Sequence, residues 1–261
     1  MTSWVCRVCG YRHRGRKPPK ECPQCSSGSF EFYLEGEKPG LDYRGEKLDV
    51  LLVNGSTHRA HNTAVLAGIA EKELKRRKLS YRRVDLNEID IRHCWCCYSM
   101  RDSACTYPCR NQLDQMPKLH EMLLNSKAVI VVSPINWNNM SARLKDFLDR
   151  LTCIQNLPLL GKESPTVGKA VAILINGHED GAMKTALDIF VYFQQMGYAL
   201  VPFGFAYRTH GAGKNAGTDD AFFKKDRLAN EQVTKVVGNL AEFIKFGVEE
   251  KARKKIQPVA E

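Results

Sequence analysis

The sequence lacks any long hydrophobic run. No stretch approaches the roughly 18 consecutive apolar residues that a membrane helix requires, and the first residues, Met1–Cys6, contain no apolar signal core. We therefore expect a protein of the reducing cytoplasm that is not inserted in a membrane. The sequence also has no internal repeat and no low-complexity tract.

The composition is that of a globular protein. Hydrophobic residues make up 43% of the 261 positions and the mean hydropathy is −0.36, which excludes a disordered or fibrous chain. Lysine and arginine outnumber aspartate and glutamate by 39 to 29, a net charge of +10. The length suits one domain of about 200 residues with a small appendage, or two domains of about 100 to 150 residues.

The ten cysteines fall into separate groups. Four lie in the first 25 residues, five lie between Cys94 and Cys109, and Cys153 stands alone. In a reducing compartment this usage indicates metal or redox chemistry more than disulfides. Residues 34–45 are polar, contain glycine and proline and lack apolar periodicity, which is typical of a linker. We predict a metal-binding domain at residues 1–36, a linker at 37–46 and a main domain at 47–261.

The first cysteine group predicts a metal site. Two C-x-x-C pairs are separated by twelve residues, and this spacing lets all four thiolates face one tetrahedral metal ion. A domain of about 35 residues cannot bury enough apolar surface to fold alone, so a metal is physically expected. The spacing alone leaves zinc and iron open. The predicted ligands are Cys6, Cys9, Cys22 and Cys25.

Residues after the linker alternate between apolar strands and amphipathic helices. The pattern favours one doubly wound, mostly parallel five-stranded α/β sheet, whose ligands bind beyond the carboxyl ends of the strands. We read residues 207–220, rich in glycine and polar residues, as a long surface loop. The predicted strands are 48–53, 81–86, 128–133, 170–175 and 198–203, and the predicted helices are 63–78, 141–151, 182–196 and one that contains 233–244.

The first strand-to-helix loop, residues 54–63, has the chemistry of a phosphate-binding loop. Gly55 permits close backbone approach, Ser56 and Thr63 offer hydrogen bonds, and the helix start presents N–H groups to an anion. An ordinary N-capped turn has similar residues. This loop alone therefore does not decide between the two interpretations.

The second loop carries a recognisable pattern. Residues 134–150 fit P-x-x-W-x-x-M-S-A-x-x-K-x-F-x-D-R, which resembles the signature of the NADPH-dependent FMN reductase family, whose fold is flavodoxin-like. The first loop fits that family's G-S-x-x-x-x-x-N-T, and residues 176–181 stand where the family closes over the flavin ring. The resemblance covers roughly residues 47–245. It implies a single FMN per chain.

The resemblance also implies site residues, although it assigns no catalytic side chain. His58 stands where the family usually has arginine, and Asn136 stands where an aromatic residue is usual. The FMN phosphate would be held by Ser56, His58, Asn62 and Thr63. The isoalloxazine and ribityl chain would be lined by Pro134, Ile135, Asn136, Trp137 and Met140, and the ring pocket would be completed by Gly177, His178 and Gly181.

The N-terminal cysteine segment is similar to the short rubredoxin-like domain of rubrerythrins. The shared string is C-x-x-C-G-Y-x-H-x-G-x-x-P-P-x-x-C-P-x-C. In that family one iron cycles between the ferric and ferrous states. The resemblance favours iron over zinc at Cys6, Cys9, Cys22 and Cys25.

The second cysteine group resembles the cluster loop of the iron-sulfur flavoproteins only in part. Cys94, Cys97 and Cys105 lie at or near positions that bind a [4Fe–4S] cluster there, but Met100 occupies the third ligand position. Methionine is a poor cluster ligand beside thiolates. We therefore expect reduced cysteines packed in a loop or a subunit contact rather than a cluster. A redox-active thiol pair is a further alternative.

Together these features predict an FMN-dependent oxidoreductase that uses NAD(P)H and exchanges electrons with a rubredoxin-type iron. Its acceptor would be a small molecule or a protein, and the family resemblance implies a homodimer or homotetramer. One alternative is an electron carrier between proteins without nucleotide turnover. Another, suggested by the charge of +10, is a zinc ribbon that binds nucleic acid. The main domain has no basic stripe interleaved with aromatics, so we expect no nucleic-acid partner.

Overall fold

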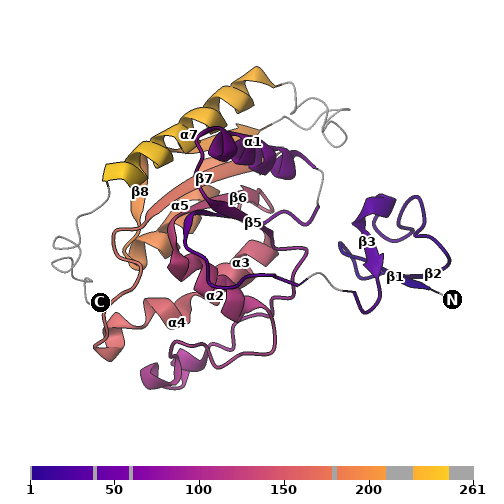
Figure 1. Cartoon of the computed structure of the whole chain (residues 1–261). Helices are drawn as coiled ribbons and strands as arrows, with labels where there is room; N and C mark the ends of the chain where they lie inside the picture. The colour runs from indigo at the N-terminus through magenta and orange to yellow at the C-terminus, as the bar shows by residue number, and fades with distance from the viewer. Residues whose placement is uncertain (1, 38–39, 59–60, 178–180, 210–225, 247–261) are drawn as a thin grey trace.

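The computed structural model describes residues 2–37, 40–58, 61–177, 181–209 and 226–246 (Figure 1). Its strands are β1 (Ser3–Cys6), β2 (Arg12–Arg14), β3 (Phe32–Leu34), β4 (Leu48–Asn54), β5 (Tyr81–Asp85), β6 (Ser126–Pro134), β7 (Ala170–Gly177) and β8 (Ala199–Thr209). Its α-helices are α1 (Asn62–Arg76), α2 (Met116–Asn125), α3 (Ala142–Asp149), α4 (Thr152–Gln155), α5 (Ala182–Gln195) and α7 (Arg227–Phe246).

The N-terminal part forms a three-stranded antiparallel sheet in the order β2-β1-β3. Its buried apolar residues are few: the cluster consists of Cys6, Cys22 and Phe32, with a handful of half-buried neighbours. So small a core contributes little hydrophobic stabilisation. The cysteines at its centre are therefore the main remaining source of stabilisation for this domain.

The main domain is a five-stranded sheet in the order β5-β4-β6-β7-β8, and every pairing is parallel. This order is that of a doubly wound flavodoxin-like sheet. The predicted fold class is confirmed, and each predicted strand has its counterpart in the sheet.

Helices cover both faces of this sheet (Figure 1). Because side chains alternate along a strand, Val50 and Leu52 join the cluster under α1 and α7, whereas Leu51 and Val53 join the cluster under α2, α3, α4 and α5. Strands buried on both faces read as continuous apolar runs. That explains why β4, β6 and β7 show no polar alternation.

Two elements differ from the prediction. Strand β8 runs on to Thr209 because Tyr207 and Thr209 pair with Ile175 and Gly177 of β7, so residues 207–209 are not part of a loop. Residues 210–220 lie outside the described part of the chain. Helix α2 was not predicted, although its buried residues, Met116, Leu119, Met122 and Leu123, have helical spacing.

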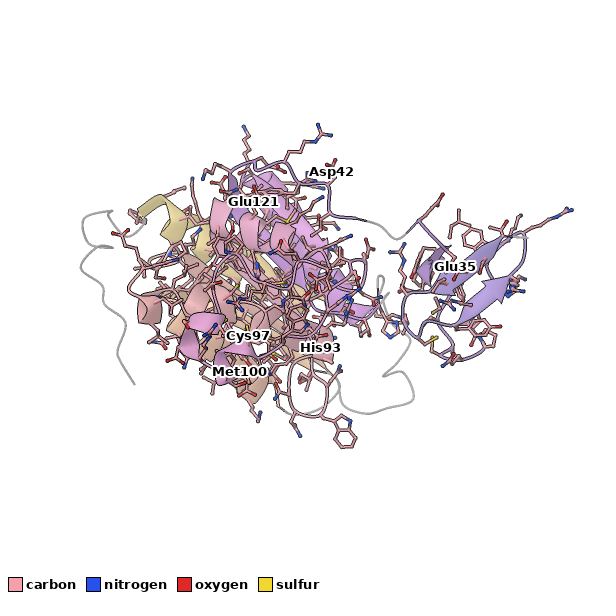
Figure 2. All side chains as sticks on the ribbon, turned by 90° about the horizontal axis from the view of Figure 1, so that it is seen from below. Glu35, Asp42, His93, Cys97, Met100 and Glu121 are labelled. Atoms are coloured by element: carbon pink, nitrogen blue, oxygen red, sulfur yellow. The ribbon has the colours of Figure 1, made fainter. Side chains whose placement is uncertain are left out.

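The second half of the segment 37–46 is attached to the main domain. Leu41 accepts a hydrogen bond from Lys118 Nζ at 2.6 Å and donates one to Gln115 Oε1 at 3.2 Å. Tyr43 is buried, and its hydroxyl donates to Glu46 O at 2.6 Å. Figure 2 shows the result, with Asp42 and Glu121 on the main domain and Glu35 on the small one. The C-terminal half of the predicted linker is therefore packed as part of the main domain.

No helix in the described ranges is both long and apolar enough to cross a bilayer.

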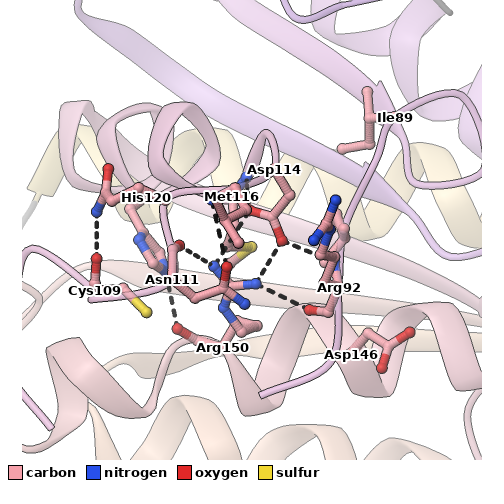
Figure 3. Close-up of polar contacts among 12 residues, drawn as sticks. Ile89, Arg92, Cys109, Asn111, Asp114, Met116, His120, Asp146 and Arg150 are labelled. Carbon is pink, nitrogen blue, oxygen red and sulfur yellow. Dashed lines mark hydrogen bonds and ion pairs between the residues drawn. The ribbon is translucent and has the colours of Figure 1, made fainter. Parts of the chain in front are cut away.

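A buried ion pair joins the loop after β5 to the end of α3 (Figure 3). Arg150 Nη1 lies 2.5 Å from Asp114 Oδ2, and the two side chains are 1% and 0% exposed. The guanidinium also donates to the carbonyls of Arg92 and Asn111 at 2.9 and 2.8 Å. Burial would raise the pKa of Asp114, but hydrogen bonds from Arg150 and from backbone N–H groups outweigh it and hold that pKa below its usual range.

We expect Asp114→Asn to lower the free energy of unfolding by about 3 to 5 kcal/mol, because it leaves the Arg150 charge buried without a counter-ion. Urea denaturation measures this loss. The matched control is Lys184→Gln, which breaks an exposed pair with Asp188 on α5 and should cost less than about 1 kcal/mol. Equal effects of the two changes would contradict the prediction.

Candidate functional site

Three loops meet at the carboxyl ends of β4, β6 and β7. Ser141 Oγ donates to Gly55 O at 2.6 Å, which joins the first loop to the second. Ile135 N donates to Asn176 O at 2.8 Å, which joins the second to the third. The three loops predicted to lie at the strand ends therefore meet and form one surface.

The first loop is held in shape by its own polar groups. Asn54 is fully buried. Its Oδ1 accepts a hydrogen bond from Ser56 N at 3.1 Å, and its Nδ2 donates one to Asp85 Oδ1 at 2.5 Å. His58 N donates to Ser56 Oγ at 3.1 Å. Sequence reasoning did not assign a role to Asn54. The feature that could have indicated it is a polar residue at the end of an otherwise apolar strand.

This loop leaves buried polar atoms without partners. Within the described ranges, no side chain caps the N-terminus of α1, and neither His58 Nδ1 nor Asn62 Oδ1 has a hydrogen-bond partner. Burial, and then the neighbouring His61, lower the pKa of His58, so this ring is neutral at neutral pH. Buried polar groups without partners are costly, and helix N-termini bind phosphate. The N–H groups at this helix start can therefore donate to a phosphate group, whereas Asn62 Oδ1 would need a separate donor.

The second loop ends in a two-residue turn. Asn136 and Asn139 exchange backbone hydrogen bonds of 2.7 and 3.0 Å, and between them Trp137 and Asn138 have φ values of 50° and 57°. A tryptophan in the left-handed region is strained, and such strain gathers at functional sites. Trp137 is fully exposed, so it is not a core aromatic.

The third loop approaches the second at two glycines. A Cβ at Gly177 would lie 2.6 Å from Ile135 Cδ1, and a Cβ at Gly181, whose φ is +103°, would lie 2.6 Å from Asn138 Oδ1. Only glycine lets these backbones come so close. His178, between them in sequence, lies outside the described residues.

The predicted flavin residues thus line one edge of the sheet but differ in exposure. Ser56, Thr63 and Met140 are buried, and Asn136 and Trp137 are exposed. Met140 packs into the apolar cluster under α3 and α5. Pro134, Ile135 and Asn62 are half-buried between these extremes. A flat ligand could lie along such an edge with one end in the polar loop and the other beside Trp137.

The four N-terminal cysteines form one compact group. Their Sγ atoms all lie within 4.8 Å of one another, with 3.7 Å between Cys6 and Cys25 and 3.6 Å between Cys9 and Cys22. A tetrahedron with metal–sulfur bonds of about 2.3 Å has edges of about 3.8 Å, so these distances suit a metal ion. Burial raises the pKa of the Cys6 thiol to about 12. A cation is therefore needed to keep this thiol ionised.

The turn that follows β1, residues 6–10, faces the main domain across a groove. Arg7 Nη1 lies 3.9 Å from Glu88 Oε1, and the groove of about 280 Å³ beside them is also lined by Cys6, Thr57 and Arg143. Arg143 donates to carbonyls of the loop after β5, including Ile89 O at 2.9 Å, and so supports Glu88 from behind. No local pattern of residues indicates this contact, because it depends on how two separate domains meet.

The second cysteine group lies in the main domain, around a small cavity. A cavity of about 10 Å³, the size of one water molecule, is lined by Cys94, Cys97, Cys105, Cys109 and Cys153. Met100, at the expected third ligand position, is 85% exposed and is not part of the lining. Figure 2 shows Cys97 and Met100 on the main domain.

Comparison with known proteins identifies both parts of the chain. Residues 48–212 match the family described as NADPH-dependent FMN reductase, and residues 4–32 match the rubredoxin-like domain of rubrerythrin. Over 35 residues the chain is 49% identical to a putative rubrerythrin of Methanocaldococcus jannaschii, covering 13% of this chain and 17% of that protein.

Two further relatives match the main domain. An iron-sulfur flavoprotein of Archaeoglobus fulgidus is 28% identical over 107 residues, covering 41% of this chain and 46% of that protein. A crystal structure of RosB with bound 8-demethyl-8-formylriboflavin-5'-phosphate has a TM-score of 0.63 at 19% identity, covering 82% of this chain and 90% of that one. The chain spans less than half the length of the curated relatives described here.

We expect Asn62→Asp to raise the dissociation constant for FMN at least tenfold, about 1.4 kcal/mol, because it places a carboxylate beside the phosphate. The same change adds an acidic residue to the first turn of α1, where the helix dipole favours it. Thermal unfolding of the apoprotein should therefore be unchanged or occur at higher temperature. Fluorescence titration of the apoprotein with FMN measures binding.

Asn62→Ala separates the two contributions in this test. It removes the hydrogen bonds without adding charge and should cost about 0.5 to 1.5 kcal/mol of FMN binding. Wild-type affinity in Asn62→Asp would show that the phosphate lies elsewhere.

We expect metal analysis of the wild-type chain to find about one iron, and Cys9→Ser to lose it, because three thiolates cannot complete the tetrahedral site. The main domain has its own two apolar clusters, so its unfolding transition should remain. Cys96→Ser, at an exposed cysteine of the second group that does not line its cavity, should keep the iron. One zinc in place of iron would exclude a redox role for this centre.

Proposed function

Because the chain belongs to the family of NADPH-dependent FMN reductases, we propose that it is an FMN-dependent oxidoreductase that uses NAD(P)H and exchanges electrons with an iron in its N-terminal domain. The observation that carries this proposal is the meeting of three loops around an uncapped helix N-terminus at the carboxyl edge of the sheet. Such an edge is where doubly wound sheets bind their ligands.

The first loop would hold the phosphate of FMN. Ser56, Thr63 and the first N–H groups of α1 supply donors there, and Asn62 adds a side-chain amide at the same turn. His58 is neutral, so the helix dipole rather than a histidine charge would balance the phosphate. FMN, when bound, supplies two-electron hydride chemistry and one-electron release.

The second and third loops would hold the ring system. The turn at residues 136–139 is fixed by two backbone hydrogen bonds and presents Trp137 at its tip. Gly181 lets the third loop approach Asn138. Together these loops would orient the flavin face and exclude water from one side of it.

A nicotinamide nucleotide would have to share the open side of this site. The sequence has no separate dinucleotide fingerprint between a strand and a helix, so NAD(P)H and the electron acceptor would use the same mouth in turn. The net charge of +10 favours anionic partners such as a pyridine nucleotide or an acidic protein. We propose a small molecule or a protein as acceptor.

The iron domain would act as a one-electron port. Its cysteine loop meets the main domain at Arg7 and Glu88, beside Thr57 of the phosphate loop. A contact at this position supports exchange within one chain rather than only across a subunit interface.

A homodimer or homotetramer in the cytoplasm remains part of this proposal. Helix α5 exposes Met183, Leu187 and Val191 at spacings of four residues, an apolar stripe of the kind that a second copy covers. All ten cysteines lie in the described ranges and none of them is in a disulfide, which suits a reducing compartment.

Anaerobic titration with NADPH and NADH tests the assignment as an oxidoreductase. The proposed enzyme should lose its flavin absorbance at about 450 nm with one of these nucleotides. An electron carrier without nucleotide turnover would respond to dithionite only. That outcome would replace the proposal by the carrier alternative.

We expect the Arg7–Glu88 contact to control the rate at which electrons reach the iron. After flavin reduction, the ferric absorbance should bleach at a rate independent of protein concentration. Arg7→Glu should slow this step at least tenfold, about 1.4 kcal/mol, because like charges then face each other. The double variant Arg7→Glu/Glu88→Arg should recover most of the rate.

Stopped-flow spectroscopy measures these rates. The control is Arg12→Glu, which alters an exposed ion pair with Glu35 in the small domain. Iron content and reduction potential should match in all variants. A rate that rises linearly with protein concentration would show that the iron serves a separate partner instead.

A further inference from the structure

Five cysteines from two distant segments converge in the main domain, away from the loops at the sheet edge. Four come from the loop between β5 and α2, and Cys153 comes from α4. The sulfur-lined cavity is about 10 Å³ and is also bordered by Arg150. The function proposed above does not use this cluster.

Cys109, from the loop between β5 and α2, and Cys153, from α4, line this one cavity and influence each other's ionisation. Cys153 is 2% exposed and its Sγ also lies 3.5 Å from Arg150 O and 3.8 Å from His120 Nε2. Cys109 is only partly buried. One thiol of the pair can therefore be reached from solvent, whereas the other is held behind it.

Arg150 supplies a positive charge to this pair. Its guanidinium is bound to Asp114, but Nε is buried and has no hydrogen-bond partner among the described residues. Figure 3 shows Cys109 near this network. The same guanidinium adjoins Cys109 and favours its anionic form. A thiolate beside a fixed cation is the usual environment of a reactive cysteine.

The pKa values of the Cys109 and Cys153 thiols are shifted in opposite directions, which suits different roles for the two. The hydrogen bond from Cys153 is the largest influence, and together with Asn111 N–H and Arg150 it outweighs burial and lowers the pKa of Cys109 to about 6. The same hydrogen bond, with burial, raises the pKa of Cys153. At neutral pH the pair therefore consists of one thiolate nucleophile and one protonated thiol.

The sulfur atoms of this second group are not arranged around one point as the four N-terminal sulfur atoms are. In the described part of the chain, Cys6, Cys9, Cys22 and Cys25 are the group whose ligand atoms all lie within 4.8 Å. Cys109 and Cys153 border the same cavity of about 10 Å³ from two separate segments, an arrangement that suits a bond between two sulfurs rather than a four-ligand metal site.

We propose that Cys109 and Cys153 form a reversible disulfide, with a hydroperoxide as the oxidant. The Cys109 thiolate attacks the peroxide, the O–O bond breaks, and a sulfenic acid and water form after protonation. The Cys153 sulfur then attacks the sulfenic sulfur, and a second water leaves. In total, two thiols and one hydrogen peroxide give one disulfide and two waters. A dithiol reverses the reaction by exchange.

The test uses the full-length, metal-loaded protein, reduced with dithiothreitol and freed of it without oxygen. One equivalent of hydrogen peroxide is added, remaining thiols are alkylated, and the digest is mapped by mass spectrometry. We expect a peptide pair joined through Cys109 and Cys153, two thiols lost per peroxide consumed, and full recovery with dithiothreitol.

Three variants separate the roles of the two cysteines. Cys153→Ser should give a Cys109 sulfenic acid that dimedone labels, without a disulfide. Cys109→Ser should lower the rate of peroxide consumption by the main domain at least tenfold and leave Cys153 unmodified. Cys96→Ser, at an exposed cysteine outside the cavity, should react as the wild type does.

Other outcomes would overturn the proposal. A disulfide between Cys97 and Cys105, or first oxidation at Cys96, would show that Arg150 does not select the reactive thiol. Stoichiometric acid-labile sulfide in protein purified without oxygen would show that these cysteines bind an iron–sulfur cluster instead.

Discussion

The ion pair of Arg150 with Asp114 determines the arrangement of the loop that joins β5 to α2. Through carbonyls of Arg92 and Asn111, one guanidinium fixes a long segment with little regular structure against the end of α3. Desolvating two charges is costly, and only a full set of hydrogen bonds compensates for it. The ion pair therefore holds this loop, with the cysteines that it carries, against the end of α3.

Helix α3 links this ion pair to the sheet edge. The N-cap of this helix is Ser141, which donates to Gly55 O of the first loop, and its C-cap is Arg150. The two loops at its start leave a helix N-terminus uncapped and polar atoms unpaired. The buried ion pair thus lies at one end of α3, and the unsatisfied hydrogen-bonding groups of the first loop and of the α1 N-terminus lie beside its other end, where a ligand contributes most.

Much of the fold could be predicted from the sequence because apolar runs and periodicity report burial directly. Leu48–Asn54 and Ala170–Gly177 form buried strands as their composition indicated. The four N-terminal cysteines were found through spacing alone. Contacts that depend on three-dimensional packing could not be found this way. Neither the meeting of Cys109 with Cys153, 44 positions apart, nor that of Arg7 with Glu88 leaves a local pattern.

The attachment of Leu41 and Tyr43 to the main domain has a kinetic consequence. It shortens the tether of the small domain, and a short tether keeps a bound module at an effective concentration in the millimolar range. An external protein that competes for the surface contacted by the small domain must overcome this high effective concentration. Such a protein would gain access mainly while the small domain is dissociated, so, under the proposed function, the tether length would set how electrons are divided between the two.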